Sequence, residues 1–129
     1  MGAPHWFRVF KHKRRVARAL AEVNSRRALG IQHNLDGKLV VSLTSYPARF
    51  ETLAKTLRSL LLQSMQADKT ILWIAHDAID KLPADVLACQ AQGLTIQATH
   101  ELRSYTKLIP TLSAYPDAYI VTADDDVYY

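Results

Sequence analysis

The chain has 129 residues, a length typical of one domain with a single hydrophobic core. Its composition is 49% hydrophobic and 22% charged, which excludes a disordered or collagen-like chain. The net charge of +4 is unevenly distributed, because residues 1–38 carry +7 and the remaining residues carry −3. A basic segment therefore precedes a mildly acidic domain.

Cysteine content and hydropathy bear on the compartment. The single Cys89 cannot form an intrachain disulfide, which favours a reducing environment, and we expect it to be a small buried apolar residue rather than a nucleophile. No apolar run approaches the ~20 residues that span a bilayer. The basic N-terminus lacks the apolar core of a secretion signal. We therefore expect a cytoplasmic protein.

Residues 6–28 predict a basic helix in front of the domain. Its apolar residues recur along one stripe, which Lys13 interrupts: Trp6, Val9, Val16, Leu20 and Val23. Such a helix suits an anionic membrane surface, a nucleic acid, or packing of its weak apolar face on the domain or a partner. Residues 30–37 indicate a linker with a turn at its end. The predicted organisation is a leader and linker over 1–37 and a domain over 38–129.

Within the domain, apolar runs alternate with segments of helical periodicity. The apolar or alternating runs predict strands at 39–43, 70–75, 94–98 and 119–123. Apolar residues at helical spacing predict helices at about 50–64, at about 83–92, and between Tyr105 and Tyr115. Pro83 suits the start of the second helix and Gly93 its end, whereas Pro110 must lie near the start of the third or kink it.

This alternation predicts an α/β fold: a Rossmann-like, mostly parallel sheet with helices on both faces. In such sheets, ligands bind beyond the carboxyl ends of the strands. Polar residues follow each predicted strand, at Thr44–Arg49, His76–Asp77, His100–Arg103 and Asp124–Asp126. We expect these four stretches to meet at one rim and to form the functional site.

The acidic triplet Asp124, Asp125 and Asp126 is the strongest candidate for chemistry. Adjacent carboxylates repel one another, so a fold that gathers them needs a compensating cation. Carboxylate oxygens suit Mg²⁺ or Mn²⁺, which usually share their shell with substrate phosphates. The alternative is a solvated acidic loop. The chain contains neither G-x-x-x-x-G-K-[ST] nor G-x-G-x-x-G, and it has no Cys/His cluster for zinc.

The turn after the first strand offers another way to hold a nucleotide. Thr44 and Tyr46 lie at the strand end, where the tyrosine ring can stack on a base, and the Arg49 guanidinium can grip phosphate. Asp77 can accept a hydrogen bond from a base or ribose. The alternatives are a half-buried packing role for Tyr46 and a turn for Asp77.

Arg103 and Lys107 lie before the last strand and form a second polar group. Either cation can meet the charge of a diphosphate, or can pair with Glu101 or with the acidic triplet. Both alternatives stay open at this point.

The segments VVSLTSYPARFETLAKTLRSLLLQS, ILWIAHDA and IVTADDDVYY resemble the amino-terminal half of a family 2-like bacterial glycosyltransferase of the GT-A fold. The resemblance covers about residues 38–129. Its most specific part is an apolar strand that ends in an Asp-x-Asp motif, here Asp124–Asp126, at the expected distance from an opening strand and its Thr-x-Tyr turn.

The resemblance implies roles for individual residues. Thr44 and Tyr46 match the turn that contacts the nucleotide base, with Arg49 as a companion, and Asp77 matches the acidic residue that reads uracil. Residues near the diphosphate and ribose are matched loosely by Arg103 and Lys107. In the acidic motif, the resemblance places Asp124 and Asp125 at the nucleotide and Asp124 and Asp126 at the metal, with Asp126 as the direct ligand.

The implied function is metal-dependent transfer of a sugar from a nucleotide donor, a UDP-sugar, to the hydroxyl of a sugar or lipid-linked acceptor. The cofactor would be Mn²⁺ or Mg²⁺, and the setting polysaccharide assembly at the inner membrane face. We expect the chain to hold only the donor-binding half, truncated after the acidic motif, with the general base in the missing half. Alternatives are a non-catalytic nucleotide- or metal-binding module and a nucleic-acid-binding protein driven by residues 8–27. We expect no nucleic-acid partner, because the domain is acidic.

Overall fold

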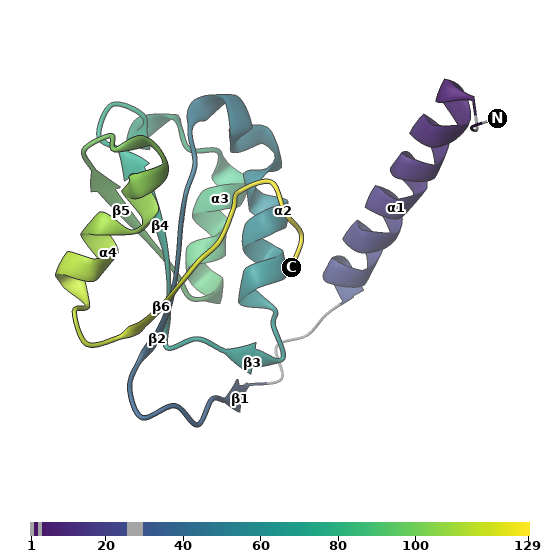
Figure 1. The fold of residues 1–129 in the computed structure, drawn as a ribbon. Coiled ribbons are helices and arrows are strands. Elements are labelled where there is room, and N and C mark those ends of the chain that lie inside the picture. Colours follow the sequence, from purple (N-terminus) through teal and green to yellow (C-terminus); the bar gives the residue numbers. More distant parts are fainter. Residues whose placement is uncertain (1, 3, 26–29) are drawn as a thin grey trace.

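A four-stranded parallel sheet with the strand order β5-β4-β2-β6 forms the centre of the domain in the computed structural model (Figure 1). The structure describes residues 2, 4–25 and 30–129. The strands of this sheet are β2 (Leu39–Thr44), β4 (Lys69–Ala75), β5 (Leu94–Thr99) and β6 (Tyr119–Thr122). The predicted α/β class with parallel strands is confirmed, whereas periodicity carried no information about the order in which the strands pair.

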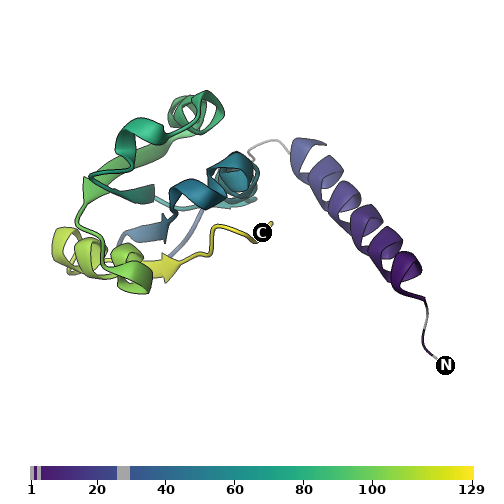
Figure 2. The ribbon, with the colours of Figure 1, turned by 90° about the horizontal axis from the view of Figure 1, so that it is seen from above.

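The helices cover both faces of this sheet (Figure 2). The helices are α1 (His5–Ser25), α2 (Phe50–Leu61), α3 (Ala84–Ala88) and α4 (Ile109–Ala114), and the 3-10 turns are η1 (Pro47–Arg49), η2 (Ile79–Lys81), η3 (Cys89–Gln92) and η4 (Arg103–Lys107). Helices α2 and α3 lie on one face, and α4 lies on the other. Helix α1 extends away from the domain.

Alternation along the strands divides the core between the two faces. Leu72 and Ile74 of β4 point toward α2 and α3 and join the larger cluster, which includes Leu53. Ile71 and Trp73 of the same strand point to the opposite face and pack with Val40, Tyr115 and Ala118. Because side chains alternate along a strand, one apolar run can supply both layers. Cys89 is 3% exposed and belongs to the larger cluster, as expected for an inert thiol.

The predicted helices are found with changes, and the one expected over about 83–92 is divided into α3 and the 3-10 turn η3. Pro47 lies in the first turn of η1, and α2 ends at Leu61 rather than near residue 64. The helix expected between Tyr105 and Tyr115 is divided into η4 and α4, because Pro110 lies in the first turn of α4, where its missing N–H is tolerated. The leader helix ends at Ser25, and the end predicted at residue 28 lies outside the described residues.

The linker expected over residues 30–37 is partly wrong. Ile31–Gln32 forms a short strand, β1, that pairs in parallel with β3 (Met65–Gln66). His33 Nε2 lies 2.6 Å from Asp68 Oδ2, and the same carboxylate oxygen accepts the Leu39 amide at 2.7 Å. These contacts involve pairs of residues about 30 positions apart, so local turn signals could not reveal them. No helix in the described part of the chain is both long and apolar enough to cross a bilayer.

Candidate functional site

A cavity of about 410 Å³ opens at the carboxyl edge of the sheet, where the loops after β2 and β6 meet. These loops are neighbours because β2 pairs directly with β6. The lining residues are Thr44, Ser45, Tyr46, Arg49, Glu101, Arg103, Lys107, Ala123, Asp124 and Asp125. Ligand sites of parallel α/β sheets lie at this edge, so its position alone makes the cavity the principal candidate.

Asp125 connects the acidic triplet to the opposite side of the cavity. Ser45 Oγ, on a residue that is 5% exposed, donates to Asp125 Oδ2 at 2.6 Å. Thr56 Oγ1, from α2, donates to the main-chain oxygen of Asp125 at 2.9 Å. The middle carboxylate therefore points into the protein and holds the loop after β6 against β2 and α2. Its role in this arrangement is structural.

Arg49 connects the aromatic and acidic sides of the rim. Its Nε donates to Tyr46 Oη at 2.9 Å, and its Nη1 lies 2.7 Å from Asp126 Oδ2. The Tyr46 hydroxyl and then the Asp126 carboxylate raise the pKa of Arg49, and the same guanidinium lowers the pKa of Asp126. Tyr46 and Asp126, 80 positions apart in the sequence, are thus joined through one guanidinium.

Lys107 neutralises the remaining carboxylate, because its Nζ lies 2.7 Å from Asp124 Oδ1. A buried polar network formed by β2, β4 and α4 holds its main-chain carbonyl. Thr111 Oγ1 and Ser42 Oγ both donate to the Lys107 carbonyl, and Trp73 Nε1 donates to Thr111 Oγ1 at 2.8 Å. Buried hydroxyl and indole groups that all find partners make a rigid support. The sheet therefore fixes the position from which this ammonium reaches the rim.

The segment that carries Arg103 has a strained backbone. Arg103 has φ 55°, which is the left-handed region, and its amide donates to Glu101 Oε1. Glu101 Oε1 also accepts the Thr106 hydroxyl at 3.2 Å, and that hydroxyl accepts the Leu102 amide at 2.9 Å. A non-glycine residue in this region costs free energy, and such strain is concentrated at functional sites. Within the described part of the chain, the Arg103 guanidinium has no carboxylate within 4.0 Å.

The predicted site residues are largely brought together. Seven of them line the cavity: Thr44, Tyr46, Arg49, Arg103, Lys107, Asp124 and Asp125. Asp126 lies beside it through Arg49. Thr44 has a structural contact, because its hydroxyl donates to the Trp73 carbonyl at 2.7 Å.

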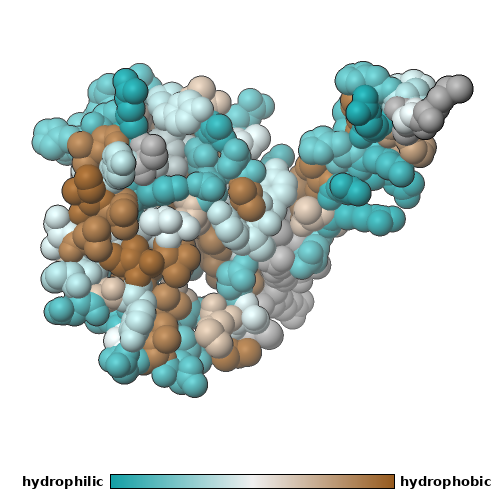
Figure 3. Space-filling view, in the orientation of Figure 1, coloured by the Kyte–Doolittle hydropathy of each residue, from teal (hydrophilic) through white to brown (hydrophobic). Residues whose placement is uncertain are grey.

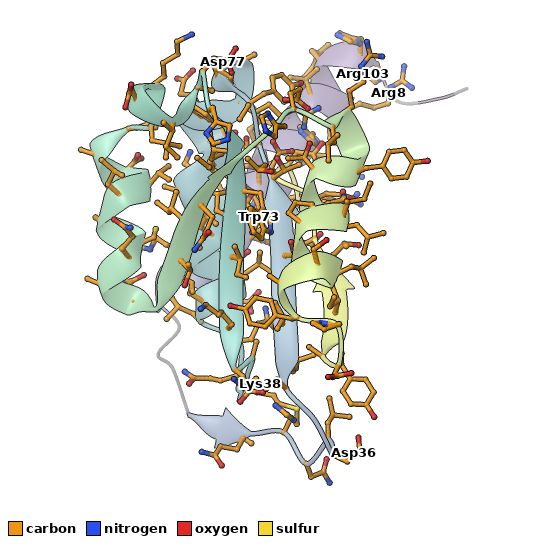
Figure 4. All side chains as sticks on the ribbon, turned by 90° about the vertical axis from the view of Figure 1, so that its left-hand side faces the viewer. Arg8, Asp36, Lys38, Trp73, Asp77 and Arg103 are labelled. Atoms are coloured by element: carbon orange, nitrogen blue, oxygen red, sulfur yellow. The ribbon has the colours of Figure 1, made fainter. Side chains whose placement is uncertain are left out.

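Asp77 is not part of this lining. It is exposed in the loop after β4, and Figure 4 shows it at the same end of the molecule as Arg103, opposite Lys38 and Asp36. The expectation that each strand end is followed by polar residues at one edge therefore agrees with the structure. The expectation that Asp77 shares the cavity does not.

Two residues that shape the site, Ser45 and Thr56, were not identified from the sequence, and Glu101 was expected only as an ion-pair partner of Arg103 or Lys107. Ser45 and Thr56 hold Asp125, and Glu101 holds the backbone of Arg103. Nothing in the sequence marks Ser45 or Thr56, because their partner lies 80 and 69 positions away.

The predicted metal ligands are Asp124 and Asp126, both exposed. Their oxygens are the hard donors that Mg²⁺ and Mn²⁺ prefer, and a metal that shares its shell with phosphates needs only one or two carboxylates. Yet each carboxylate here faces a cation of the chain, and the described residues contain no group of three or more His, Cys, Asp or Glu placed to share a metal. The donor chemistry fits a divalent cation, and binding would require exchange of the Arg49 and Lys107 pairs.

Repulsion among the three carboxylates was the sequence argument for a metal. In the structure, ion pairs with Arg49 and Lys107 offset that repulsion, so repulsion by itself is no longer a reason to expect a bound metal ion. Comparison with known proteins finds no matching family model, no matching curated protein and no matching solved structure.

Proposed function

We propose that the cavity binds the diphosphate and base of a nucleotide sugar, a UDP-sugar, and that the chain is the donor-binding half of a metal-dependent glycosyltransferase. The observation that supports this proposal is the Tyr46–Arg49–Asp126 connection. These three side chains lie together at the carboxyl edge of the parallel sheet. The Tyr46 ring can stack on a base, the Arg49 guanidinium can bind phosphate, and the Asp126 carboxylate can bind a hard metal ion.

The charges of the site suit an anion that arrives with a divalent cation. Three cations, Arg49, Arg103 and Lys107, face four carboxylates, those of Glu101 and the acidic triplet. A diphosphate would take Arg49 and Lys107 away from the acidic residues, and the released carboxylates would then be free for a metal. The metal would neutralise negative charge that develops on the leaving diphosphate.

The proposed reaction is attack of an acceptor hydroxyl on the anomeric carbon. The new glycosidic C–O bond forms as the bond between that carbon and the diphosphate oxygen breaks, and the hydroxyl proton leaves to a base. In this chain, Arg103 and Lys107 would stabilise the charge of the departing diphosphate. The choice of uracil as the base rests on the resemblance alone, because Asp77, its expected reader, lies outside the cavity.

Titration calorimetry with UDP, with and without Mn²⁺, tests the proposal on the wild type, on Asp126→Asn and on Asp117→Asn. Asp117 is an exposed carboxylate near the opposite edge of the sheet, so its variant is a charge-matched control. We expect Mn²⁺-dependent binding in the wild type and the control, and affinity at least about tenfold lower in Asp126→Asn, as for loss of a charged contact. Equal binding by all three proteins, or no effect of Mn²⁺, would overturn the proposal.

A second candidate is a nucleotide-binding module without catalysis. Every carboxylate that lines the cavity already accepts a hydrogen bond from the chain: Glu101 from Arg103 and Thr106, Asp124 from Lys107, and Asp125 from Ser45. The carboxylates of the cavity are thus already engaged with groups of the chain, and none stands apart as a base for an acceptor hydroxyl. Release of UDP from UDP-sugars in the presence of simple sugar acceptors would rule out this second candidate, because a non-catalytic module binds a UDP-sugar without cleaving it.

A further inference from the structure

Helix α1 is strongly amphipathic, and its two sides differ in chemistry as well as in polarity. Residues three or four positions apart share a face of a helix. One side carries cations, namely Arg8, Lys11, Arg14, Arg15 and Arg18, and the other carries apolar groups, namely Trp6, Val9, Phe10, Val16 and Leu20. Glu22 is the sole acidic residue of the helix. The leader is therefore a basic amphipathic helix and more than a solvated charged segment.

The two ends of α1 have different surroundings. Leu20 is partly buried and lines a hollow with Ala54 and Arg58 of α2, so the C-terminal end of α1 rests on the domain. The N-terminal half extends away from the other elements, as Figure 2 shows. There Trp6 is 70% exposed and Phe10 is 53% exposed. Large aromatic side chains thus face solvent on the part of the helix that the domain does not cover.

The same half of α1 places cations beside its aromatic rings. Lys11 Nζ lies 4.8 Å from the centroid of the Phe7 ring, and the Arg14 guanidinium lies 5.7 Å from that of Phe10. In Figure 3 the surface of this helix is mostly teal, with smaller brown and tan apolar areas. Aromatic rings flanked by lysine and arginine suit the headgroup region of a membrane, where rings enter the acyl boundary and cations meet lipid phosphates.

We propose that the N-terminal half of α1 docks on the surface of an anionic phospholipid bilayer. The apolar side, with Trp6, Val9 and Phe10, enters the interface, and the cations beside it meet the negative headgroups. Lys13 lies within the apolar side, and its long stem allows its ammonium to reach the headgroups. This docking does not depend on what the cavity binds.

A nucleic acid is the main competing partner for a basic helix, and the structure favours lipid over it. A helix that binds nucleic-acid phosphates needs cations, but it does not need an exposed apolar side. Nucleic-acid binding would therefore leave the exposure of Trp6 and Phe10 unexplained. The domain that follows carries −3 over residues 39–129 and would repel a long polyanion. A bilayer satisfies both sides of the helix at once.

Co-sedimentation with vesicles of phosphatidylcholine, with or without 30% phosphatidylglycerol, measures the docking on the full chain. The test variants are Phe10→Asp and the double variant Arg14→Glu/Arg18→Glu. The controls are Leu87→Asp, an exposed leucine on α3, and Lys38→Glu/Lys81→Glu, two exposed domain lysines. We expect binding to anionic vesicles only, at least about tenfold weaker in both test variants and unchanged in both controls. Circular dichroism verifies that each variant is folded.

Tryptophan fluorescence gives a second readout that locates the contact. The chain has two tryptophans, and Trp73 is 7% exposed in the core, so a blue shift on addition of anionic vesicles reports Trp6. Trp6→Phe should abolish the shift and keep most of the sedimentation. Equal binding to neutral and anionic vesicles would overturn the proposal, as would full vesicle binding by Phe10→Asp. It would also be overturned if the chain bound duplex DNA more tightly than anionic vesicles and Phe10→Asp left the DNA binding unchanged.

Discussion

Ser45 Oγ donates a hydrogen bond of 2.6 Å to Asp125 Oδ2 across 80 positions of sequence. The serine follows the second strand of the fold and the aspartate follows the last one, so this single contact fastens the two loops that form the cavity. The orientation of the Asp125 side chain also distinguishes it from the two other aspartates of the acidic triplet. Its carboxylate is turned inward, and its neighbours Asp124 and Asp126 remain at the surface, where a ligand would meet them.

Replacement of Ser45 by alanine should destabilise the protein by about 1–3 kcal/mol, because a mostly buried carboxylate then loses a hydrogen-bond donor. Urea unfolding measures the change. Ser113→Ala is the matched control, since the Ser113 hydroxyl is exposed and donates only to the Ile109 carbonyl. The control should stay within about 0.5 kcal/mol of the wild type. A Ser45→Ala protein as stable as this control would show that the contact does not hold the rim.

Thr111→Val should cost about 1–3 kcal/mol, although valine has nearly the same shape. Thr111 is fully buried, and its hydroxyl both accepts the Trp73 indole N–H and donates to the Lys107 carbonyl. Its removal leaves buried polar groups without partners. Thr52→Val, at an exposed position on α2, controls for the loss of a hydroxyl. Comparable stability of the two variants would contradict a stabilising role for the hydrogen bonds among Trp73, Thr111 and Lys107.

The stability of the protein should fall in acid through Asp68. The Leu39 amide and then His33 hold the pKa of this carboxyl below its ordinary value of 3.8. Because the folded pKa is lowered, the stabilisation is present at higher pH and is lost as the pH falls below about 4. The urea midpoint of Asp68→Asn should therefore lie below that of the wild type at pH 6, and the gap should narrow at pH 3.

Asp80→Asn is the control for this pH series, because Asp80 is exposed in the short turn η2. Its midpoint should follow that of the wild type at every pH. A gap between Asp68→Asn and the wild type that stays constant down to pH 3 would be inconsistent with a titrating contact at the base of β2.

Gly93→Ala should destabilise the protein by about 1–2 kcal/mol through the backbone alone. Gly93 ends η3 with φ 103°, which L-residues rarely adopt, while an added Cβ would meet nothing within 4 Å. Gly37→Ala is the matched control, because its Cβ would only make an ordinary contact of 3.5 Å with the Tyr119 ring. Thermal unfolding compares them. Equal melting temperatures would mean that the turn before β5 relaxes without cost.

Much of the fold followed from local patterns. The apolar runs that became β2 and β4, the helical spacing of Phe50, Leu53 and Leu57, and the Pro83 and Gly93 boundaries all act between near neighbours in sequence. Features of this kind can be predicted from the sequence, because the period of the apolar residues indicates which face of a strand or helix is buried. The rule that ligands bind at the carboxyl edge then located the rim correctly.

The sequence by itself therefore determined the four central strands, their parallel sense, most of the helical segments and the edge at which the polar loops gather. Tertiary structure alone decided that β2 lies between β4 and β6, and hence that Tyr46 and Asp126 meet through Arg49 while Asp77 falls outside the cavity. It also decided that Arg49 and Lys107 neutralise the acidic triplet. The physical reason is the separation in sequence. Strand order and ion pairing depend on groups 17 to 80 positions apart, and no local pattern in the sequence indicates that such groups lie close in space.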